Sequence, residues 1–238
     1  MAQAAPFAAS DFFAWLEEWL AGLPAVSMDN LVTEAGGPQG VGVFSADMIN
    51  GFCHFGPLAS KRIHAIIQPI VALFTRAYAA GVRDVVLLQD AHPADSPEFE
   101  AYGPHCIAGS PEAQTIPEFT ALPFSGLFHV IPKTSLNPAL GTEFDPWLDE
   151  RGFPEVMIAV GNCTDLCLYQ LAMHLRMRSD VARLKRAVVV PADCAQTYDV
   201  PVEKARQAGI APHPGDLLHA LFLYHLHLNN VRVVRTMT

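Results

Sequence analysis

Short runs of aliphatic residues alternate along the chain with longer segments in which apolar residues recur every three or four positions. The short runs predict strands buried on both faces, and the longer spacing predicts amphipathic helices. The predicted strands span 41–48, 82–90, 126–133, 156–162, 186–193 and 231–236. The predicted helices span 10–22, 59–80, 142–151, 165–179, 201–208 and 215–229. This alternation predicts a three-layer, doubly wound α/β fold with a six-stranded, mostly parallel sheet and helices on both faces.

Two segments do not follow this alternation of strand and helix patterns. Residues 25–40 end in EAGGPQG and are expected to be an irregular connector, so we divide the chain into a leading helix and connector, 1–40, and a main domain, 41–238. Residues 91–125 are rich in Pro, Gly, His and acidic residues, and a loop of this length usually carries function.

Composition and charge narrow the class of partner. Hydrophobic residues make up 51% of the 238 residues, and 15 Lys+Arg against 24 Asp+Glu give a net charge of −9. A compact acidic protein of this kind favours a small-molecule substrate over nucleic acid or an anionic membrane, and no apolar run is long enough to span a bilayer. The N-terminus lacks the basic start of a signal peptide, and an odd number of widely spaced cysteines, five, favours a reducing, cytoplasmic location.

The leading helix carries two Phe and two Trp in an amphipathic array. Monomers rarely leave so much apolar surface open, so we expect this helix to pack on its own domain or on a neighbouring subunit. A homo-oligomer is the resulting expectation.

Reactive side chains follow the ends of four predicted strands, where the ligand crevice of an open parallel sheet lies. Cys167 lies in the first turn of the helix after the fourth strand, with Thr164 or Asp165 available as its cap. The positive end of that helix and a nearby lysine favour a thiolate there, although most cysteines are simply buried and inert. Asp47, after the first strand, fits a general base or a turn residue. Lys133, after the third strand, fits a charge partner for both, or a solvated edge lysine.

A second cluster follows the second strand. Asp90 and His92 alternate in an extended segment and so point to the same side, while Glu98 and His105 follow in the irregular loop. Such a donor set suits a divalent metal such as Zn, Fe or Mn, and Asp95 and Glu100 are competing ligands. From the residues alone, a chance cluster in a polar loop explains the pattern equally well.

The motifs FSADMINGF, IPK and GNCTDLCL, in this order and at these strand ends, resemble those of the isochorismatase-like cysteine hydrolases, and nicotinamidases in particular. The resemblance covers roughly 41–236 and implies a catalytic triad of Asp47, Lys133 and Cys167. It also implies a cis peptide between Asn162 and Cys163 and an oxyanion hole formed by the backbone N–H groups of Cys163 and Cys167.

The resemblance further implies metal ligands at Asp90, His92 and His105. The third histidine of many nicotinamidases is replaced by Ser96, and Glu98 has the spacing of the glutamate that other members use instead. Two departures weaken the case for a pyridine substrate: Ala91 stands where a Trp is usual, and TSLNPAL lacks the usual aromatic residue. The expected substrate pocket consists of Phe52, Phe99, Tyr102 and Asn162.

The implied reaction is hydrolysis of a small carboxamide, such as nicotinamide to nicotinate, with release of ammonia through a thioester. One alternative is a metal-free amidohydrolase of the same family that acts on carbamoyl, ureido or maleamate-like substrates. Cys167 counts against an isochorismate vinyl-ether hydrolase, because those members lack a cysteine at this position. A third alternative is a non-catalytic binding protein, since fold alone does not determine function.

Overall fold

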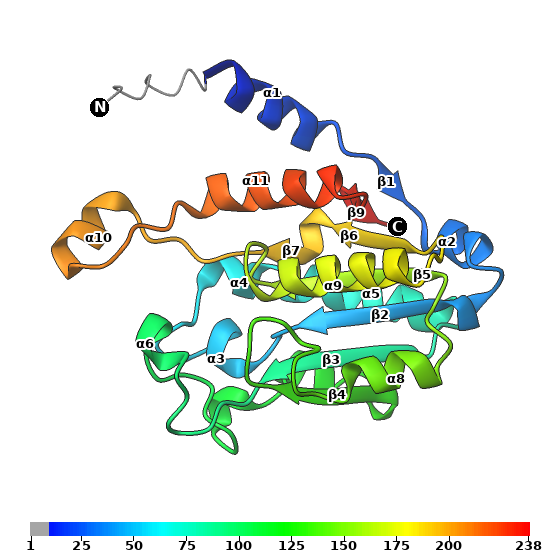
Figure 1. The fold of residues 1–238 in the computed structure, drawn as a ribbon, viewed down its shortest axis with the longest axis horizontal. Coiled ribbons are helices and arrows are strands. Elements are labelled where there is room, and N and C mark those ends of the chain that lie inside the picture. The colour runs from blue at the N-terminus through cyan, green and yellow to red at the C-terminus, as the bar shows by residue number, and fades with distance from the viewer. Residues whose placement is uncertain (1–9) are drawn as a thin grey trace.

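A computed structural model describes residues 10–238 and shows one central parallel sheet (Figure 1). Its strands lie in the order β4-β3-β2-β5-β6-β8, and β7 pairs with β5 beyond the end of β6. These strands are β2 (Val41–Ala46), β3 (Asp84–Asp90), β4 (Phe128–Lys133), β5 (Val156–Asn162), β6 (Ala187–Pro191), β7 (Ala195–Gln196) and β8 (Arg232–Val234). All six predicted strands are therefore present, and every pairing between them is parallel.

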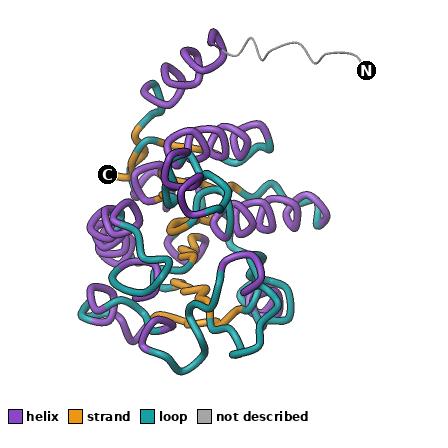
Figure 2. Tube along the Cα trace, turned by 90° about the vertical axis from the view of Figure 1, so that its left-hand side faces the viewer, coloured by secondary structure: helices purple, strands orange, loops and turns teal. Residues whose placement is uncertain are grey.

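Helices cover both faces of the sheet, as Figure 2 shows in cross-section. The helices are α1 (Ser10–Ala21), α2 (Met28–Glu34), α3 (Asn50–Cys53), α4 (Lys61–Ala65), α5 (Ile67–Ala79), α6 (Phe99–Tyr102), α7 (Pro117–Thr120), α8 (Phe144–Glu150), α9 (Cys167–Val181), α10 (Val202–Ala208) and α11 (Gly215–Leu228). One apolar core lies between the sheet and α2, α4, α5 and α7, and the other lies between the sheet and α8, α9 and α11. The three-layer prediction is confirmed.

The prediction of an irregular connector at 25–40 is wrong. Strand β1 (Ala25–Val26) pairs in parallel with β9 (Thr236–Met237), and α2 follows at once, capped by the Ser27 side chain, which accepts a hydrogen bond from the Asn30 N–H. A two-residue strand is too short for a periodic pattern, and its partner comes from the far end of the chain. This structure therefore depends on a long-range contact that local sequence does not indicate.

The predicted helix 59–80 is two helices, α4 and α5, which are separated at Ile66. Pro69 explains the break, because a proline has no N–H to donate to the carbonyl of residue 65 and its ring crowds that carbonyl. The predicted cap of α9 is also wrong: Leu166 occupies the cap position with no side-chain hydrogen bond. Thr164 and Asp165 instead bond to His219 and His213.

Helix α1 stands out from the layers (Figures 1 and 2). Its aromatic side chains pack on α11. The rings of Trp15 and Trp19 meet Tyr224 edge-on at 5.1 and 5.5 Å. Phe12, Phe13 and Trp15 nevertheless remain 38–43% exposed. In the described residues, no helix has the length and apolar character needed to cross a membrane.

Candidate active site

The strand order places the candidate residues at a switch point of the sheet. The chain proceeds outward from β2 to β3 and β4, and then returns to the other side of β2 as β5. Ligands of doubly wound sheets bind at the carboxyl ends of the strands on either side of such a point. Asp47 directly follows β2, while Asp90 and Lys133 end β3 and β4 and are paired in register. Cys167 opens α9 after β5.

Lys133 lies at the centre of these side chains. Its Nζ is 2.8 Å from Oδ2 of Asp47 and 3.4 Å from Sγ of Cys167. The same Nζ is 2.5 Å from Oδ1 of Asp90. All four residues are buried, and the donor atoms of Asp47, Asp90 and Cys167 lie within 4.8 Å of one another. The structure thus brings the three predicted triad residues together and adds Asp90 to them.

Burial controls the protonation of this group. Loss of solvent, with the charge of Asp90, raises the pKa of Asp47 to about 6 against the opposing effect of Lys133. Loss of solvent also raises the pKa of the Cys167 thiol well above its usual value, and Asp47 and Asp90 add to the effect. Lys133 lowers the pKa of this thiol, as the sequence led us to expect, but burial and the two carboxylates outweigh it, so the expected net lowering of the pKa is wrong. The resting thiol holds its proton beside a carboxylate that can accept it.

The loop after β5 presents backbone donors next to the thiol. The peptide bond between Asn162 and Cys163 is cis, as expected from the resemblance. Among the described residues, the N–H groups of Cys163 and Cys167 donate to no protein acceptor. Gly161, at φ +111°, lets β5 lie close to β2 because it has no side chain. A Cβ at this position would lie 2.1 Å from the Ala46 carbonyl oxygen.

The Asn162 side chain forms a hydrogen bond within the protein. Its side-chain Nδ2 donates to the Asp47 carbonyl oxygen at 2.6 Å, and the residue is 1% exposed. Asp47 has a positive φ of 53°, which aspartate tolerates better than most residues. Asn162 therefore holds the backbone of Asp47, and its expected place in the substrate pocket stays a prediction.

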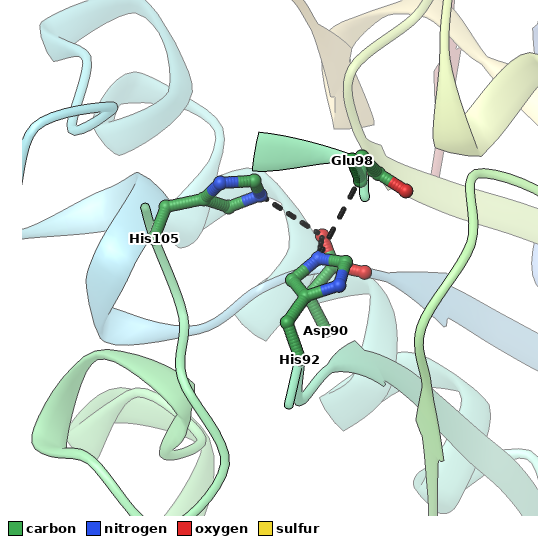
Figure 3. Close-up of side chains that lie close together, drawn as sticks. All are labelled: Asp90, His92, Glu98 and His105. Atoms are coloured by element: carbon green, nitrogen blue, oxygen red, sulfur yellow. Dashed lines mark ion pairs between the residues drawn. The ribbon is translucent and has the colours of Figure 1, made fainter. Parts of the chain in front are cut away.

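The four predicted metal ligands form one cluster (Figure 3). Asp90 links this cluster to Lys133 of the triad. Donor atoms of Asp90, His92, Glu98 and His105 all lie within 4.8 Å of one another. Nε2 of His92 is 3.4 Å from Oδ2 of Asp90 and 4.0 Å from Oε1 of Glu98, and Nε2 of His105 is 4.0 Å from Oδ2 of Asp90.

These residues fit a divalent metal ion. Neither ring nitrogen of the buried His92 has a hydrogen-bond partner in the described part of the chain. Nδ1 of His105 lies 2.8 Å from the Gly103 carbonyl oxygen, so the ring donates there and turns the lone pair of Nε2 toward Asp90. Burial and the charge of Asp90 also raise the pKa of Glu98, and a cation would relieve this repulsion. Two imidazoles and two carboxylates suit Zn, Fe or Mn.

Three predicted aromatic residues surround this cluster. The Phe99 ring lies 5.6 Å from the rings of both His92 and His105. Phe52 and Tyr102 lie 5.8 and 6.3 Å from the His105 ring. Phe99 and Tyr102 come from α6, so the long segment 91–125 places aromatic side chains beside this cluster.

Sequence reasoning missed one interaction at the nucleophile loop. Oδ2 of Asp165 lies 2.8 Å from Nε2 of His213, whose Nδ1 lies 3.0 Å from the Tyr198 carbonyl oxygen. The His213 ring stacks on that of Tyr198 at 3.7 Å. These contacts hold the loop before Cys167 against the segment 198–213, which contains α10. No sequence motif links residues 165 and 213.

Comparison with known proteins identifies the family of this chain. The family model described as the isochorismatase domain matches residues 42–214. Nicotinamidase 1 of Arabidopsis thaliana is 29% identical over 210 residues, which cover 82% of this chain and 85% of that protein.

Solved structures share the fold. A cysteine hydrolase from Pseudomonas syringae superposes with a TM-score of 0.67 at 20% identity, covering 84% of this chain and 89% of that one. N-carbamoylsarcosine amidase from Thermoplasma acidophilum gives 0.61 at 20% identity, covering 82% and 95%. Since the family model spans most of the chain, this protein belongs to the isochorismatase family.

Proposed function

We propose that this protein is a cysteine-dependent amidohydrolase that releases ammonia from a small carboxamide through a thioester intermediate. The observation that carries the proposal is the buried ammonium of Lys133, which lies 2.8 Å from the Asp47 carboxylate and 3.4 Å from the Cys167 thiol. A nucleophile, a base and a cation in mutual contact are the groups that acyl transfer requires. The relatives named as nicotinamidase and amidase support the same reaction class.

In the acylation half-reaction, Asp47 accepts the Cys167 proton as Sγ forms a bond to the amide carbon. The carbonyl oxygen becomes an oxyanion that the free N–H groups of Cys163 and Cys167 stabilise, an effect worth about 3–4 kcal/mol for one key donor. Protonated Asp47 then gives its proton to the leaving nitrogen. The C–N bond breaks, ammonia departs and a thioester remains.

In the deacylation half-reaction, Asp47 takes a proton from a water molecule that attacks the thioester carbon. The C–S bond breaks, the sulfur recovers the proton from Asp47, and the carboxylic acid leaves. Lys133 stays positively charged throughout, because Asp47, Cys167 and Asp90 together raise its pKa despite burial. Its charge stabilises the thiolate as it forms.

Asp90, His92, Glu98 and His105 would hold a divalent metal at the edge of this site. When bound, such an ion supplies a Lewis acid that orients a ligating atom of the substrate, for example a ring nitrogen.

We propose nicotinamide, converted to nicotinate, as the substrate. Phe52, Phe99 and Tyr102 lie beside the histidine cluster and form walls suited to a flat ring. The alternative is a carbamoyl, ureido or maleamate-like substrate without a metal. The absence of an aromatic side chain at Ala91 favours this alternative, as does the fold shared with N-carbamoylsarcosine amidase.

The deciding experiment measures ammonia release from nicotinamide, N-carbamoylsarcosine and maleamate, with and without a chelator. We expect nicotinamide to be hydrolysed fastest and chelation to slow its turnover. Cys167→Ala should abolish release, whereas Cys194→Ala makes the same thiol-to-methyl change at a buried position outside the site and should leave it intact. Full activity of Cys167→Ala, or no turnover of any amide by the native protein, would contradict the proposal and favour a binding protein.

We also propose a homo-oligomer in a reducing, cytoplasmic compartment. The exposed Phe12, Phe13 and Trp15 on α1 support a subunit contact, and all five cysteines are free thiols in the described structure. Light scattering tests the first point: Phe12→Ser with Trp15→Ser should lower the mass of the particle. An unchanged mass would contradict a contact through α1.

A further inference from the structure

The two histidines of the metal cluster are held in different ways. The His105 ring is fixed by a hydrogen bond, since its Nδ1 lies 2.8 Å from the Gly103 carbonyl oxygen. The His92 ring has no such bond: its Nε2 faces Asp90 at 3.4 Å, but within residues 10–238 its Nδ1 has no hydrogen-bond partner. Histidine ligands usually donate their second ring N–H to an acceptor, and that bond sets the orientation of the ring. The His92 ring therefore depends on another kind of contact.

The backbone of His92 is fixed, but this does not fix its ring. The His92 N–H donates to the Cys106 carbonyl oxygen at 3.0 Å, and the His92 carbonyl oxygen accepts from the Ala108 N–H at 2.8 Å. The last side-chain torsion of a histidine is nonetheless soft, because it joins a tetrahedral carbon to a flat ring and has broad minima. The ring keeps one orientation only if its neighbours prevent it from turning.

Phe99 is such a neighbour. The centroid of its ring lies 5.6 Å from that of His92, with 70° between the two planes, and 5.6 Å from that of His105, with 62° between the planes. The two histidine rings are themselves 4.8 Å apart at 63°. Each of the three rings thus meets the other two at a steep angle, an arrangement that aromatic rings prefer to face-to-face stacking. Turning the His92 ring would disturb two of these contacts.

In the described part of the chain, Phe99 is the one phenylalanine, tyrosine or tryptophan whose ring contacts both histidines. Phe52 and Tyr102 contact His105 alone, at 5.8 and 6.3 Å. Phe99 also directly follows Glu98, at the start of α6. The main chain that carries one ligand of the cluster therefore presents the ring that packs on two others.

We propose that Phe99 is a positioning residue for the metal, which holds the rings of His92 and His105 in the orientation that a divalent cation requires. This inference rests on the proposed function, because it presumes the metal site proposed there. Phe99 does for His92 what the Gly103 carbonyl oxygen does for His105. A ring that can take several orientations must be fixed in one of them when a metal binds, and this loss of freedom weakens binding.

Titration of Co²⁺ into the metal-free, full-length protein tests this role, with the visible absorption of the bound ion as the signal. Phe99→Leu keeps an apolar side chain but loses the flat ring. It should weaken Co²⁺ binding by about 10- to 100-fold, the loss typical when a group that orients a metal-bound histidine is removed. Its Co²⁺ absorption bands should also shift, because the ligand geometry changes. Phe99→Tyr keeps the ring and should restore the native affinity and the native bands.

Phe119→Leu is the matched control. It makes the same change at a fully buried phenylalanine of the segment 91–125, whose ring packs on Phe74 and Phe128. It should lower the melting temperature of the metal-free protein and bind Co²⁺ as the native protein does. Phe99→Leu should melt close to the native temperature, since Phe99 is only partly buried, and bind Co²⁺ weakly.

The possible failures are distinguishable. If the native protein binds Co²⁺ and Phe99→Leu binds it as tightly with the same absorption bands, this inference is wrong while the proposed metal site stands. If the native protein binds no Co²⁺, the proposed metal site is wrong and this inference with it. Equal weakening of Co²⁺ binding in Phe99→Tyr or in Phe119→Leu would also overturn the positioning role, because the Phe99 ring would then not be what matters.

Discussion

The ammonium of Lys133 lies 2.5 Å from Oδ1 of Asp90, and the other carboxylate oxygen of Asp90 lies 3.4 Å from Nε2 of His92. Asp90 thus belongs to two clusters at once. It shares Lys133 with Asp47 and Cys167, and it contributes to the four-residue metal cluster. A change of charge in one cluster therefore changes the electrostatic energy of the other.

Replacing Asp90 should damage more than metal binding. We expect Asp90→Asn to lower both the bound metal and kcat/KM, the latter by about 100-fold, because Lys133 loses one of the two carboxylates that fix its position. Glu98→Gln removes a carboxylate from the metal cluster alone. With excess metal added, Glu98→Gln should recover most of its activity and Asp90→Asn should not. Equal recovery of the two variants would show that Asp90 acts only as a ligand.

Lys133 should also be a large contributor to stability. Lys133→Met leaves the carboxylates of Asp47 and Asp90 buried without their cation, and breaking a buried ion pair in this way costs about 3–5 kcal/mol. Adding Asp90→Asn to Lys133→Met removes one of the stranded charges and should restore part of that free energy of unfolding. Urea denaturation of the native protein and the two variants at neutral pH measures both effects. A double variant no more stable than Lys133→Met would contradict this explanation.

Much of the candidate site was predictable because strand ends are visible in the sequence. Val/Leu runs fixed where Asp47, Asp90 and Lys133 fall, and parallel topology placed those positions on one edge. The sharing of Asp90 between two clusters was not foreseen, although the pairing of Asp90 with Lys133 in register would have indicated it. The raised pKa of Cys167 was missed because burial depends on all three layers, whereas the helix terminus is a local feature.

Contacts between residues far apart in the sequence could not be predicted from local patterns. Asp165 and His213 are 48 positions apart, and their contact depends on the path of the segment 198–213, which contains α10. The pairing of β1 with β9 likewise joins residues 25–26 to residues 236–237. In both cases the local pattern is compatible with several paths, and only tertiary packing selects one.

The Asp165–His213 pair should hold the nucleophile loop in place. His213→Phe keeps a ring to stack on Tyr198 but leaves the buried Asp165 carboxylate without its donor, at a cost of about 1.5–3 kcal/mol. We expect lower kcat and faster proteolysis within 199–212. His225→Phe, which removes a histidine from an exposed pair with Tyr169, is the control and should change neither. Native rates of cleavage and turnover in His213→Phe would show that the Asp165–His213 contact is not needed to hold the segment 198–213 in place.

His219 should make the protein less stable in mild acid. Burial, with the charge of Arg62, lowers the pKa of His219 to about 4, and its Nδ1 lies 2.8 Å from the Thr164 hydroxyl. Between about pH 6.5 and 4 the unfolded chain therefore binds a proton that the folded chain does not, so stability falls as the pH is lowered through this window. From pH 7 to 5 the loss from this one group is about 1–2 kcal/mol.

His219→Gln should remove this part of the pH dependence, because a glutamine side chain does not titrate and still offers a polar group to Thr164. The measurement is the free energy of unfolding in urea at pH 7 and pH 5, for the native protein and the variant. The quantity of interest is the difference between the two pH values, since this cancels any uniform cost of the substitution. An identical drop in both proteins would mean that His219 titrates normally in the folded state, and that other groups cause the acid sensitivity.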